Sequence, residues 1–230
     1  MVTVSGDACP PTPTKNMTNR SHPSRSRLLD AALQLIRMKG YAATTVEDIC
    51  EAAGVTKGSF FHHFKGKEDL AISAASHWNE KTGSLFADAA YRRLPDPRDR
   101  VLGYIDLRAE LLTGNLPDFT CLLGTMVQET FETHPAIRDA CSHGIELHAE
   151  TVAADLAEAK AKYAPQADWS PRSIALYTQA VLQGAFILAK AAGGPAVAVE
   201  CAGHLKRHVI SLLGSDPQRG PLLAEDRPVT

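Results

Sequence analysis

Apolar residues recur at spacings of three and four along most of this sequence, which is the pattern of helices that bury one face. Leu29, Leu33 and Ile36 follow this spacing near the beginning, and Tyr177 and Val181 follow it near the end. No convincing alternation of apolar and polar residues, which would indicate strands, is seen. The pattern therefore predicts an all-α fold.

Helix breakers and caps divide this pattern into about nine helices. Thr44 and Glu47 stand three residues apart, which is the spacing of a capping box. Pro97, Pro171 and Pro195 stand where new helices can begin without losing a hydrogen bond. The expected helices span residues 25–39, 45–52, 56–62, 67–90, 98–113, 118–132, 135–163, 171–192 and 195–213.

Composition divides the chain into four segments. Residues 1–23 are rich in Pro, Thr and Ser, residues 215–230 are similar, and both are expected to be disordered. Residues 24–70 contain the short predicted helices, and residues 71–214 contain the longer ones. The prediction is thus an arm, a small helical domain, a larger helical domain and a tail.

Polar residues interrupt every hydrophobic stretch. Even residues 174–192, the most apolar, contain Thr178, Gln183 and Lys190, so no segment is expected to span a membrane, which takes about 18 apolar residues. The N-terminal residues lack the apolar core and cleavage site of a secretory signal, which predicts a cytoplasmic protein.

Charge and cysteine content narrow the function only slightly. The formal net charge is −2, with nine Lys and Arg against seven Asp and Glu in residues 1–70 and fifteen against nineteen in the remainder. Such a modest asymmetry does not by itself identify a partner. Five cysteines are scattered without a CxxC pair, which argues against a disulfide framework and against a zinc site.

The stretch "TTVEDICEAAGVTKGSFFHHF" predicts two short helices joined by a tight turn. Val46 and Ile49 form one apolar face, and Gly54 can adopt the left-handed conformation that a sharp turn needs. The start of the second helix, residues 56–59, carries small or cationic side chains. Such side chains let a backbone approach a DNA groove while hydroxyls and an ammonium reach phosphates and base edges.

The longer span "RLLDAALQLIRMKGYAATTVEDICEAAGVTKGSFFHHFKGKEDL", residues 27–70, resembles the N-terminal domain of TetR-family transcriptional regulators. It matches the family pattern at AA-L, GY, TTV-DI, AGV-KG, HHF and KE-L, in register over more than forty residues. The resemblance implies an all-helical homodimer. Its N-terminal heads would enter successive major grooves of double-stranded DNA, and its larger C-terminal domain would bind a small molecule.

The resemblance also implies roles for residues of the head. Thr44 and Thr45 resemble phosphate contacts, and Lys67 would meet a phosphate at the start of the fourth helix. Phe61 stands where tyrosine is common in the family, so a phosphate hydrogen bond is replaced by apolar contact. Arg25 and Arg27, together with Arg20, are placed on a flexible arm that could reach the minor groove. The implied DNA-binding set is Arg25, Arg27, Thr44, Thr45, Thr56, Lys57, Gly58, Ser59, Phe61, His62 and Lys67.

Large apolar groups of the longer helices, with a few polar ones among them, are candidates for lining an effector pocket. Ordinary core packing is the alternative for each of them. The candidates are Trp78, Phe86, Ile105, Leu112, Leu122, Met126, Gln128, Phe131, His143, Tyr177 and Gln183.

Cys121 and the pair His62 and His63 are two further candidates for reactive or metal-binding sites. Cys121 near a helix start would suit an electrophile or redox sensor, but no Lys, Arg or His lies within three residues of it, which favours a packed thiol. His62 and His63 are adjacent and point about 100° apart on a helix, which argues against a shared metal ion. No metal and no cofactor is expected.

The last two predicted helices mix small residues such as Gly184 and Ala202 with Leu188, Leu205 and Val209. Small residues permit close helix approach, which favours a four-helix bundle made from two copies of this pair. The combined prediction is a homodimeric, ligand-responsive regulator, most simply a repressor released from a pseudo-palindromic operator by a small, largely apolar effector. Alternatives are a Cys121-based sensor and an effector-independent DNA-binding protein. The absence of GxSxG, HExxH and ExxH motifs and of a glycine-rich phosphate loop argues against an enzyme.

Overall fold

The computed structural model describes residues 23–214 and is all-helical over that range, as the sequence predicts. It has ten α-helices and one 3-10 helix there, rather than about nine helices. Their bounds are α1 (Pro23–Lys39), α2 (Val46–Ala53), α3 (Lys57–His63), α4 (Lys67–Ala87), η1 (Ala90–Arg93), α5 (Pro97–Glu110), α6 (Leu116–Phe119), α7 (Leu122–Thr130), α8 (Pro135–Tyr163), α9 (Pro171–Ala192) and α10 (Ala196–Leu213). The predicted disordered arm and tail lie outside the described residues, except for Pro23.

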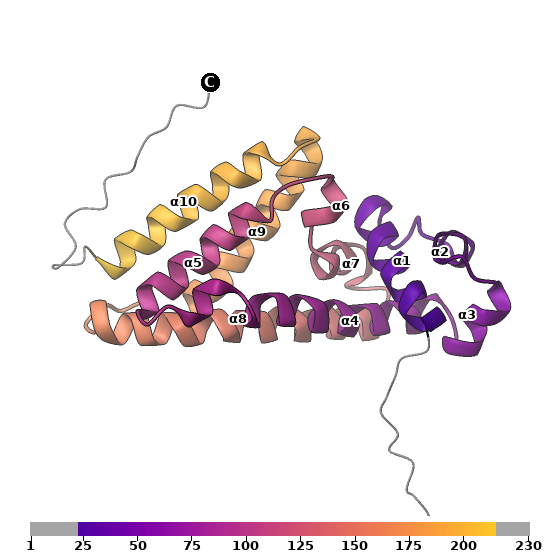
Figure 1. Ribbon diagram of the computed structural model, residues 1–230, viewed down its shortest axis with the longest axis horizontal. Coiled ribbons are helices and arrows are strands. Elements are labelled where there is room, and N and C mark those ends of the chain that lie inside the picture. The colour runs from indigo at the N-terminus through magenta and orange to yellow at the C-terminus, as the bar shows by residue number, and fades with distance from the viewer. Residues whose placement is uncertain (1–22, 215–230) are drawn as a thin grey trace, which may run out of the picture.

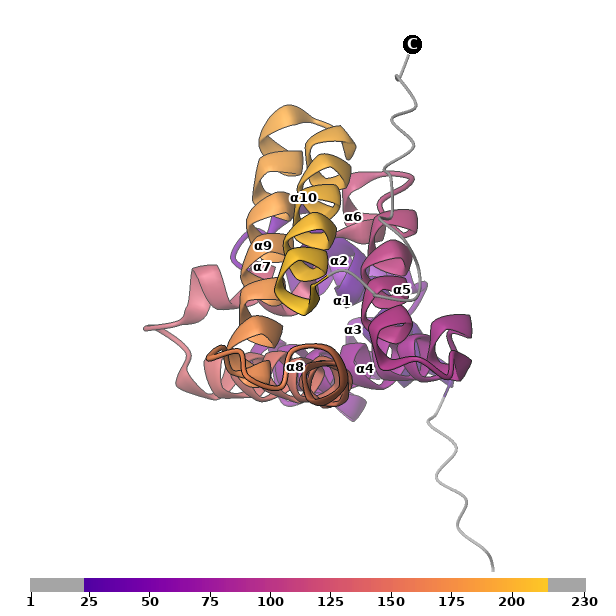
Figure 2. The same cartoon turned by 90° about the vertical axis from the view of Figure 1, so that its left-hand side faces the viewer.

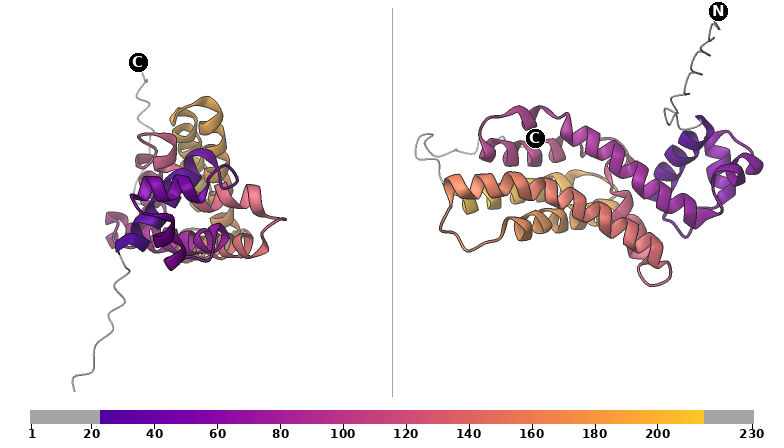
Figure 3. Two further views of the ribbon diagram at one scale, coloured as in Figure 1. Left: turned by 90° about the vertical axis from the view of Figure 1, so that its right-hand side faces the viewer. Right: turned by 90° about the horizontal axis from the view of Figure 1, so that it is seen from below.

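Helices α1, α2 and α3 form a head at one end of an elongated molecule, and the remaining helices form a body (Figure 1). Helix α4 leaves the head and runs beside the long helix α8 (Figure 1 and the right panel of Figure 3). In the end-on view, α9 and α10 lie together on one side and α5 lies on the other (Figure 2). Helix α4 and the helices packed beside it thus connect the head to the body.

The head is built around Phe60, which is completely buried against apolar residues of α1 and α2 such as Leu28 and Ile49. The turn between α2 and α3 is closed by Gly54, whose φ of 60° and ψ of 44° are left-handed. The two halves of the helix-turn-helix therefore form as the sequence predicts.

The capping box at the start of α2 is one residue later than predicted. Thr45, not Thr44, accepts a hydrogen bond from the amide of Asp48, and the Asp48 side chain accepts one from the amide of Thr45. Thr44 is fully buried, and its hydroxyl donates to the carbonyl of Gly40 at 2.6 Å. Two threonines in succession made the sequence ambiguous, and only burial separates their roles.

The apolar core has two parts. One fills the body between α5, α8, α9 and α10. The other extends from the head through α4 into α7 and the start of α8, and it contains Leu122 and Met126. Both side chains are fully buried there, and neither lines the two cavities described below. They belong to the core that joins the head to the body.

The predicted helix of residues 118–132 is two helices. Helix α6 ends at Phe119, and α7 begins after Cys121, which is its N-cap. Helix α4 similarly ends at Ala87 rather than at residue 90 and gives way to η1. These breaks allow the chain to cross the head end of the body between α5 and α8 (Figure 1).

Helix α9 is, by length and composition, apolar enough to cross a membrane, contrary to the expectation that no segment qualifies. Its polar residues are too few to lower its mean hydropathy sufficiently. A single such helix is weak evidence for a span, because core helices pass the same test. In this fold, α9 packs against α8 and α10.

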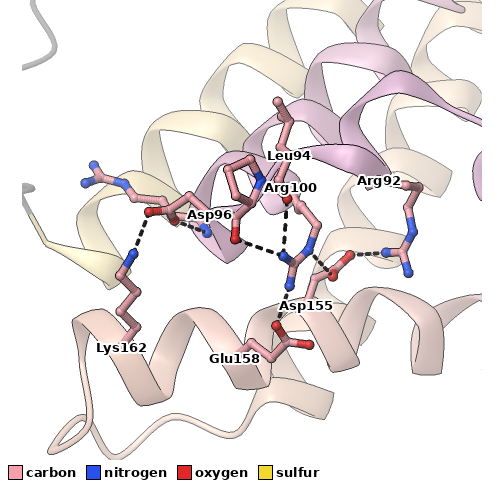
Figure 4. Close-up of polar contacts among 9 residues, drawn as sticks. Arg92, Leu94, Asp96, Arg100, Asp155, Glu158 and Lys162 are labelled. Carbon is pink, nitrogen blue, oxygen red and sulfur yellow. Dashed lines mark hydrogen bonds and ion pairs between the residues drawn. The ribbon is translucent and has the colours of Figure 1, made fainter.

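An ion network closes the end of the body far from the head (Figure 4). Asp155 on α8 is buried, and its carboxylate accepts hydrogen bonds from Arg100 Nε at 2.9 Å and from Arg92. Arg100 also contacts Glu158 and the carbonyls of the loop before α5. The network ties α8 to α5 and η1.

Replacing Asp155 should therefore destabilise the fold. The change Asp155→Asn leaves two guanidinium groups facing a neutral amide in a buried site, and we expect it to lower the free energy of unfolding by about 2–3 kcal/mol. Urea unfolding of both proteins measures the difference. Asp139→Asn on exposed α8 surface is the matched control and should leave the midpoint unchanged. Equal midpoints for Asp155→Asn and the unaltered protein would show that the network is not stabilising.

Candidate DNA-binding face and internal cavities

The N-terminal end of α3 faces solvent. Thr56 is its N-cap, and the Thr56 hydroxyl oxygen accepts from the amide of Ser59 at 3.2 Å. Thr56, Lys57 and Gly58 are exposed, and Ser59 is half-buried. Gly58 carries no side chain beside this cap, so a flat surface can approach the backbone closely. These are the four residues that the sequence places on a recognition surface.

Further exposed side chains flank this end of α3. Lys57 forms an ion pair with Glu47 of α2, and both side chains are more than half exposed. Phe61 is 59% exposed, although its ring also meets the buried ring of Phe60 edge-on at 5.2 Å. His62 and Thr45 are exposed as well.

Two residues of the implied DNA-binding set are used inside the head instead. Thr44 is buried, as described above, so its hydroxyl cannot reach a phosphate. Lys67 donates from Nζ to the carbonyls of Tyr41 and Thr44, each at 3.0 Å, and lies 4.2 Å from the centre of the Tyr41 ring. Burial lowers the pKa of Lys67, and nearby Glu129 opposes that shift. The ammonium holds the loop between α1 and α2 on the start of α4.

The arginines predicted on a flexible arm belong to α1. The Arg25 guanidinium lies 5.3 Å from the centre of the Phe64 ring, and Arg27 is exposed one turn from the helix start. The predicted helix of residues 25–39 already contains both arginines, and the structure confirms that helix rather than the arm. Pro23 stands at the first position of α1, two residues before the predicted start. Arg20 lies outside the described residues.

A cavity of about 130 Å³ lies in the body between α4, α5, α8 and α9. Four of the predicted pocket residues line it, namely Trp78, Phe86, Leu112 and Gln183. Sequence reasoning placed none of its other fourteen lining residues in a pocket: Asn79, Thr82, Leu85, Arg108, Leu111, Asp118, Phe119, Cys121, Leu123, Gly144, Ile145, His148, Gln179 and Phe186. Helical spacing could have found some of them, because Thr82 stands midway between Trp78 and Phe86 on one face.

The other predicted pocket residues lie elsewhere. Ile105 is buried in the body core. Phe131 is 56% exposed and His143 is also exposed, so neither faces the cavity. Tyr177 is exposed on α9 and packs its ring 5.1 Å from that of His208. The prediction placed bulky residues in a pocket because of their residue type. The side of the helix on which each one lies determines instead whether it faces the cavity, the core or solvent.

A buried hydrogen-bond chain forms the polar wall of the cavity. The Tyr104 hydroxyl lies 2.8 Å from His148 Nε2 and accepts from Gln179 Nε2 at 3.2 Å. Of these three residues, His148 and Gln179 line the cavity. Burial, reinforced by the charge of Arg108, lowers the pKa of His148 to about 4. His148 is therefore neutral at pH 7.

A second cavity, of about 220 Å³, adjoins the first between α7 and α9. Cys121, Gln183 and Phe186 line both cavities. Gln183 presses against Gly124, where a side-chain carbon would lie only 2.1 Å from its amide oxygen. Lys190 also lines the second cavity and donates to the Thr125 hydroxyl at 3.1 Å. The predicted residue Gln128 belongs to this cavity rather than to the first.

Cys121 has cationic neighbours that its sequence surroundings conceal. Arg37 and Lys190 are both close enough to interact electrostatically with its thiol. Its sulfur accepts from the Gly124 amide at 3.5 Å. The absence of a nearby Lys or Arg in the sequence therefore says little about the environment of this thiol.

The head touches the cavity walls at two polar joints. Glu129, which lines the second cavity, accepts hydrogen bonds from the amides of Tyr41 at 3.2 Å and of Ala42 at 2.7 Å. Arg37 of α1 lies 4.8 Å from the Trp78 ring and donates to the carbonyl of Asp118 at 3.4 Å. Trp78 and Asp118 line the first cavity. Sequence reasoning found neither joint, because each connects residues more than forty positions apart.

The outer face of α9 and α10 carries exposed apolar side chains. Tyr177 is 43%, Ile187 is 49% and Leu188 is 50% exposed. Leu205 and Val209 were predicted to help join two copies, but each is 1% exposed and belongs to the core of this chain. The face that is left for a partner is therefore centred on α9.

The depressed pKa of His148 predicts that stability falls in acid. An unfolded histidine binds a proton below about pH 6.5, whereas folded His148 resists protonation until its pKa of about 4. The stability that depends on neutral His148 is present above pH 6.5 and declines as the pH falls towards 4. We expect about 2 kcal/mol of this loss between pH 7 and 4.5.

His148→Gln cannot titrate and should remove that part of the pH dependence. Urea unfolding at pH 7.0, 5.5 and 4.5 measures it, with the exposed His204→Gln as control. A slope for His148→Gln equal to that of the control would contradict the assignment.

Comparison with known proteins agrees with this architecture. Residues 28–74 match the family model described as bacterial regulatory proteins of the tetR family. Residues 97–197 match the model described as the C-terminal domain of LmrA/YxaF-like transcriptional regulators.

Three similar proteins illustrate the match. The transcriptional regulator LmrA of Bacillus subtilis is 29% identical over 127 residues, covering 51% of this chain and 63% of LmrA. The transcriptional repressor KstR2 of Rhodococcus jostii is 50% identical over 46 residues, covering 20% of this chain and 22% of KstR2. The crystal structure of the regulatory protein TetR from Rhodobacter sphaeroides has a TM-score of 0.73 at 25% identity, covering 81% of this chain and 99% of that one.

The match thus spans less than two thirds of the length of these two curated relatives, and it spans nearly all of the solved structure. Both curated relatives are named as regulators of transcription, not as enzymes. The head, the body and both family models point to one assignment: this chain belongs to the TetR family of bacterial regulatory proteins.

Proposed function

We propose that the protein is a cytoplasmic, homodimeric transcriptional repressor that binds double-stranded operator DNA and releases it when a small molecule occupies the body. One observation carries this proposal: three of the residues that line the two cavities also contact the head. Trp78 and Asp118 meet Arg37, and Glu129 meets the loop after α1. A ligand in either cavity therefore touches what positions the head.

DNA recognition is assigned to the start of α3 and its surroundings. Thr56 and Ser59 present hydroxyls, Lys57 presents an ammonium, and Gly58 allows close approach. The Lys57 ion pair with Glu47 would be exchanged for a phosphate contact. Because an exposed ion pair contributes only about 0–1 kcal/mol, that exchange costs little. Thr45, Phe61 and His62 flank this surface.

Dimerisation is assigned to the outer face of α9, where Leu188 and Ile187 are half-exposed. A two-fold partner there would place two heads on one face of a duplex, about 34 Å or one turn apart. The operator would accordingly be a pseudo-palindrome.

Release is assigned to a shift in the angle between head and body. Lowering operator affinity a hundredfold requires about 2.7 kcal/mol of coupling between the two sites, which is within the usual range. Rearranging the hydrogen bonds at Glu129 or Arg37 is of that magnitude, since hydrogen bonds to charged groups contribute about 1.5–3 kcal/mol.

The recognition surface is tested by a gel shift with the DNA upstream of the gene itself or of its neighbours. Thr56→Ala combined with Lys57→Ala removes a hydroxyl and an ammonium from the assigned surface. We expect at least a tenfold loss of affinity and a salt dependence reduced by about one phosphate contact.

The matched control is Arg172→Ala with Ser173→Ala at the exposed start of α9, which also removes one cation and one hydroxyl. It should bind DNA normally. Equal binding by the α3 variant and the control would count against the assigned surface.

The dimer face is tested with Leu188→Glu. A carboxylate in the centre of an apolar interface costs several kcal/mol when it is buried without a partner, so the protein should become monomeric. Light scattering after gel filtration measures its mass, and the same sample should bind DNA weakly. Because Leu188 is half-exposed in the single chain, the thermal midpoint of the monomer should remain measurable. Glu200→Gln on exposed α10 serves as control, and a variant that stays dimeric would reject this face.

A further inference from the structure

The first cavity contains a cation without an anionic partner. Arg108 of α5 lines it, with its guanidinium 5.5 Å from the centre of the Phe86 ring and 5.6 Å from that of Phe186. Within residues 23–214, Arg108 forms no ion pair and no hydrogen bond. The two rings hold the guanidinium by cation–π contact and leave its donors directed at the cavity or at solvent.

The charges around Arg108 do not neutralise it. Asp118, the acidic residue of the cavity wall, already accepts from the Asn115 amide at 2.9 Å and attracts Arg37. Asp106 on the same helix is paired with Lys206. His148 is neutral at pH 7, as shown above. The carboxylate of the cavity wall is therefore engaged with other groups and forms no ion pair with Arg108.

The rest of the cavity suits a flat apolar group. Trp78, Phe86, Phe119 and Phe186 line it. Its volume of about 130 Å³ is close to that of the apolar cavity of about 150 Å³ that holds benzene in another protein. The cavity therefore has room for about one six-membered ring and a short substituent.

We infer that the first cavity binds a small aromatic carboxylate, with the ring among the aromatic side chains and the carboxylate on Arg108. A guanidinium and a carboxylate pair through two parallel hydrogen bonds, which fixes the ligand's orientation as well as its charge. The side-chain amides of Gln179 and Gln183 on α9 line the same cavity and can bind further substituents of the ring. This inference rests on the proposed function for its regulatory meaning and names the class of effector.

Three probes that share one ring test the charge preference: benzoate, benzamide and benzylamine. Binding to the full chain is measured by ligand-observed NMR titration at low salt, in the absence of DNA. We expect benzoate to bind at least about tenfold more tightly than neutral benzamide, because a charge-assisted hydrogen bond is the stronger kind. Cationic benzylamine should bind most weakly. Similar affinities for benzoate and benzamide, or no binding of either, would overturn the inference.

Variants of the same protein test whether the preference for benzoate over benzamide arises at Arg108. Arg108→Gln should lower benzoate affinity to that of benzamide and leave benzamide binding unchanged. Arg172→Gln, on the exposed start of α9, should retain the benzoate preference. The Trp78 indole should also report benzoate by a change in fluorescence, which Trp78→Phe abolishes. A benzoate preference that survives in Arg108→Gln contradicts the assignment. The comparison of the three probes on the unaltered chain decides the question even if Arg108→Gln folds poorly.

A gel shift with saturating benzoate separates this inference from the proposed function. If benzoate binds through Arg108 and releases the operator, both stand. If it binds through Arg108 and the operator complex persists, the carboxylate site stands and the assignment of this cavity to release fails. If the operator is bound but benzoate shows no preference over benzamide, only the carboxylate site fails.

Discussion

The loop between α1 and α2 is held from two sides by opposite charges, and the position of the head depends on it. On one side, the carboxylate of Glu129 accepts hydrogen bonds from the amides of Tyr41 and Ala42. On the other side, the ammonium of Lys67 donates hydrogen bonds to the carbonyls of Tyr41 and Thr44. Peptide groups have a donor end and an acceptor end, so this arrangement satisfies both. Glu129 comes from α7 and Lys67 from α4, and the loop therefore joins the head to two body helices at once.

This joint explains why Gly40 stands where it does. Its φ of 90° is left-handed, and a side-chain carbon there would lie 2.3 Å from Glu129 Oε1. A residue with a side chain would meet backbone strain and a steric clash together. The same glycine ends α1, so a feature that the sequence shows as a helix stop also makes room for a carboxylate 89 positions further on. Local and long-range requirements coincide at one residue.

How much the sequence could predict follows this division between local and long-range contacts. The turn at Gly54 and the exposed start of α3 depend on neighbours in the chain, and both were predicted correctly. The choice of Thr44 or Thr45 as the N-cap of α2 depends on which of the two the rest of the fold buries, and the prediction of Thr44 was wrong. Met126 and Ile105 were recognised as large and apolar. Whether such a side chain points into a cavity or into the core depends on which helices pack against it, and the sequence does not specify that packing. The polar wall at Tyr104, His148 and Gln179 joins three helices and leaves no local pattern.

The two cavities therefore differ in what they can transmit. The first is lined by aromatic rings, by neutral polar groups and by Arg108. It meets the head through Arg37, whose guanidinium lies over the Trp78 ring. A ligand that moves the indole acts on α1 from the side of α4. The second meets the head through Glu129, whose carboxylate is already committed to two amides. Lys190 lines that cavity and interacts electrostatically with Glu129, so an anion bound at Lys190 would weaken that attraction. Because Gln183 and Phe186 separate the two spaces, a ligand long enough to displace them would act on both joints together.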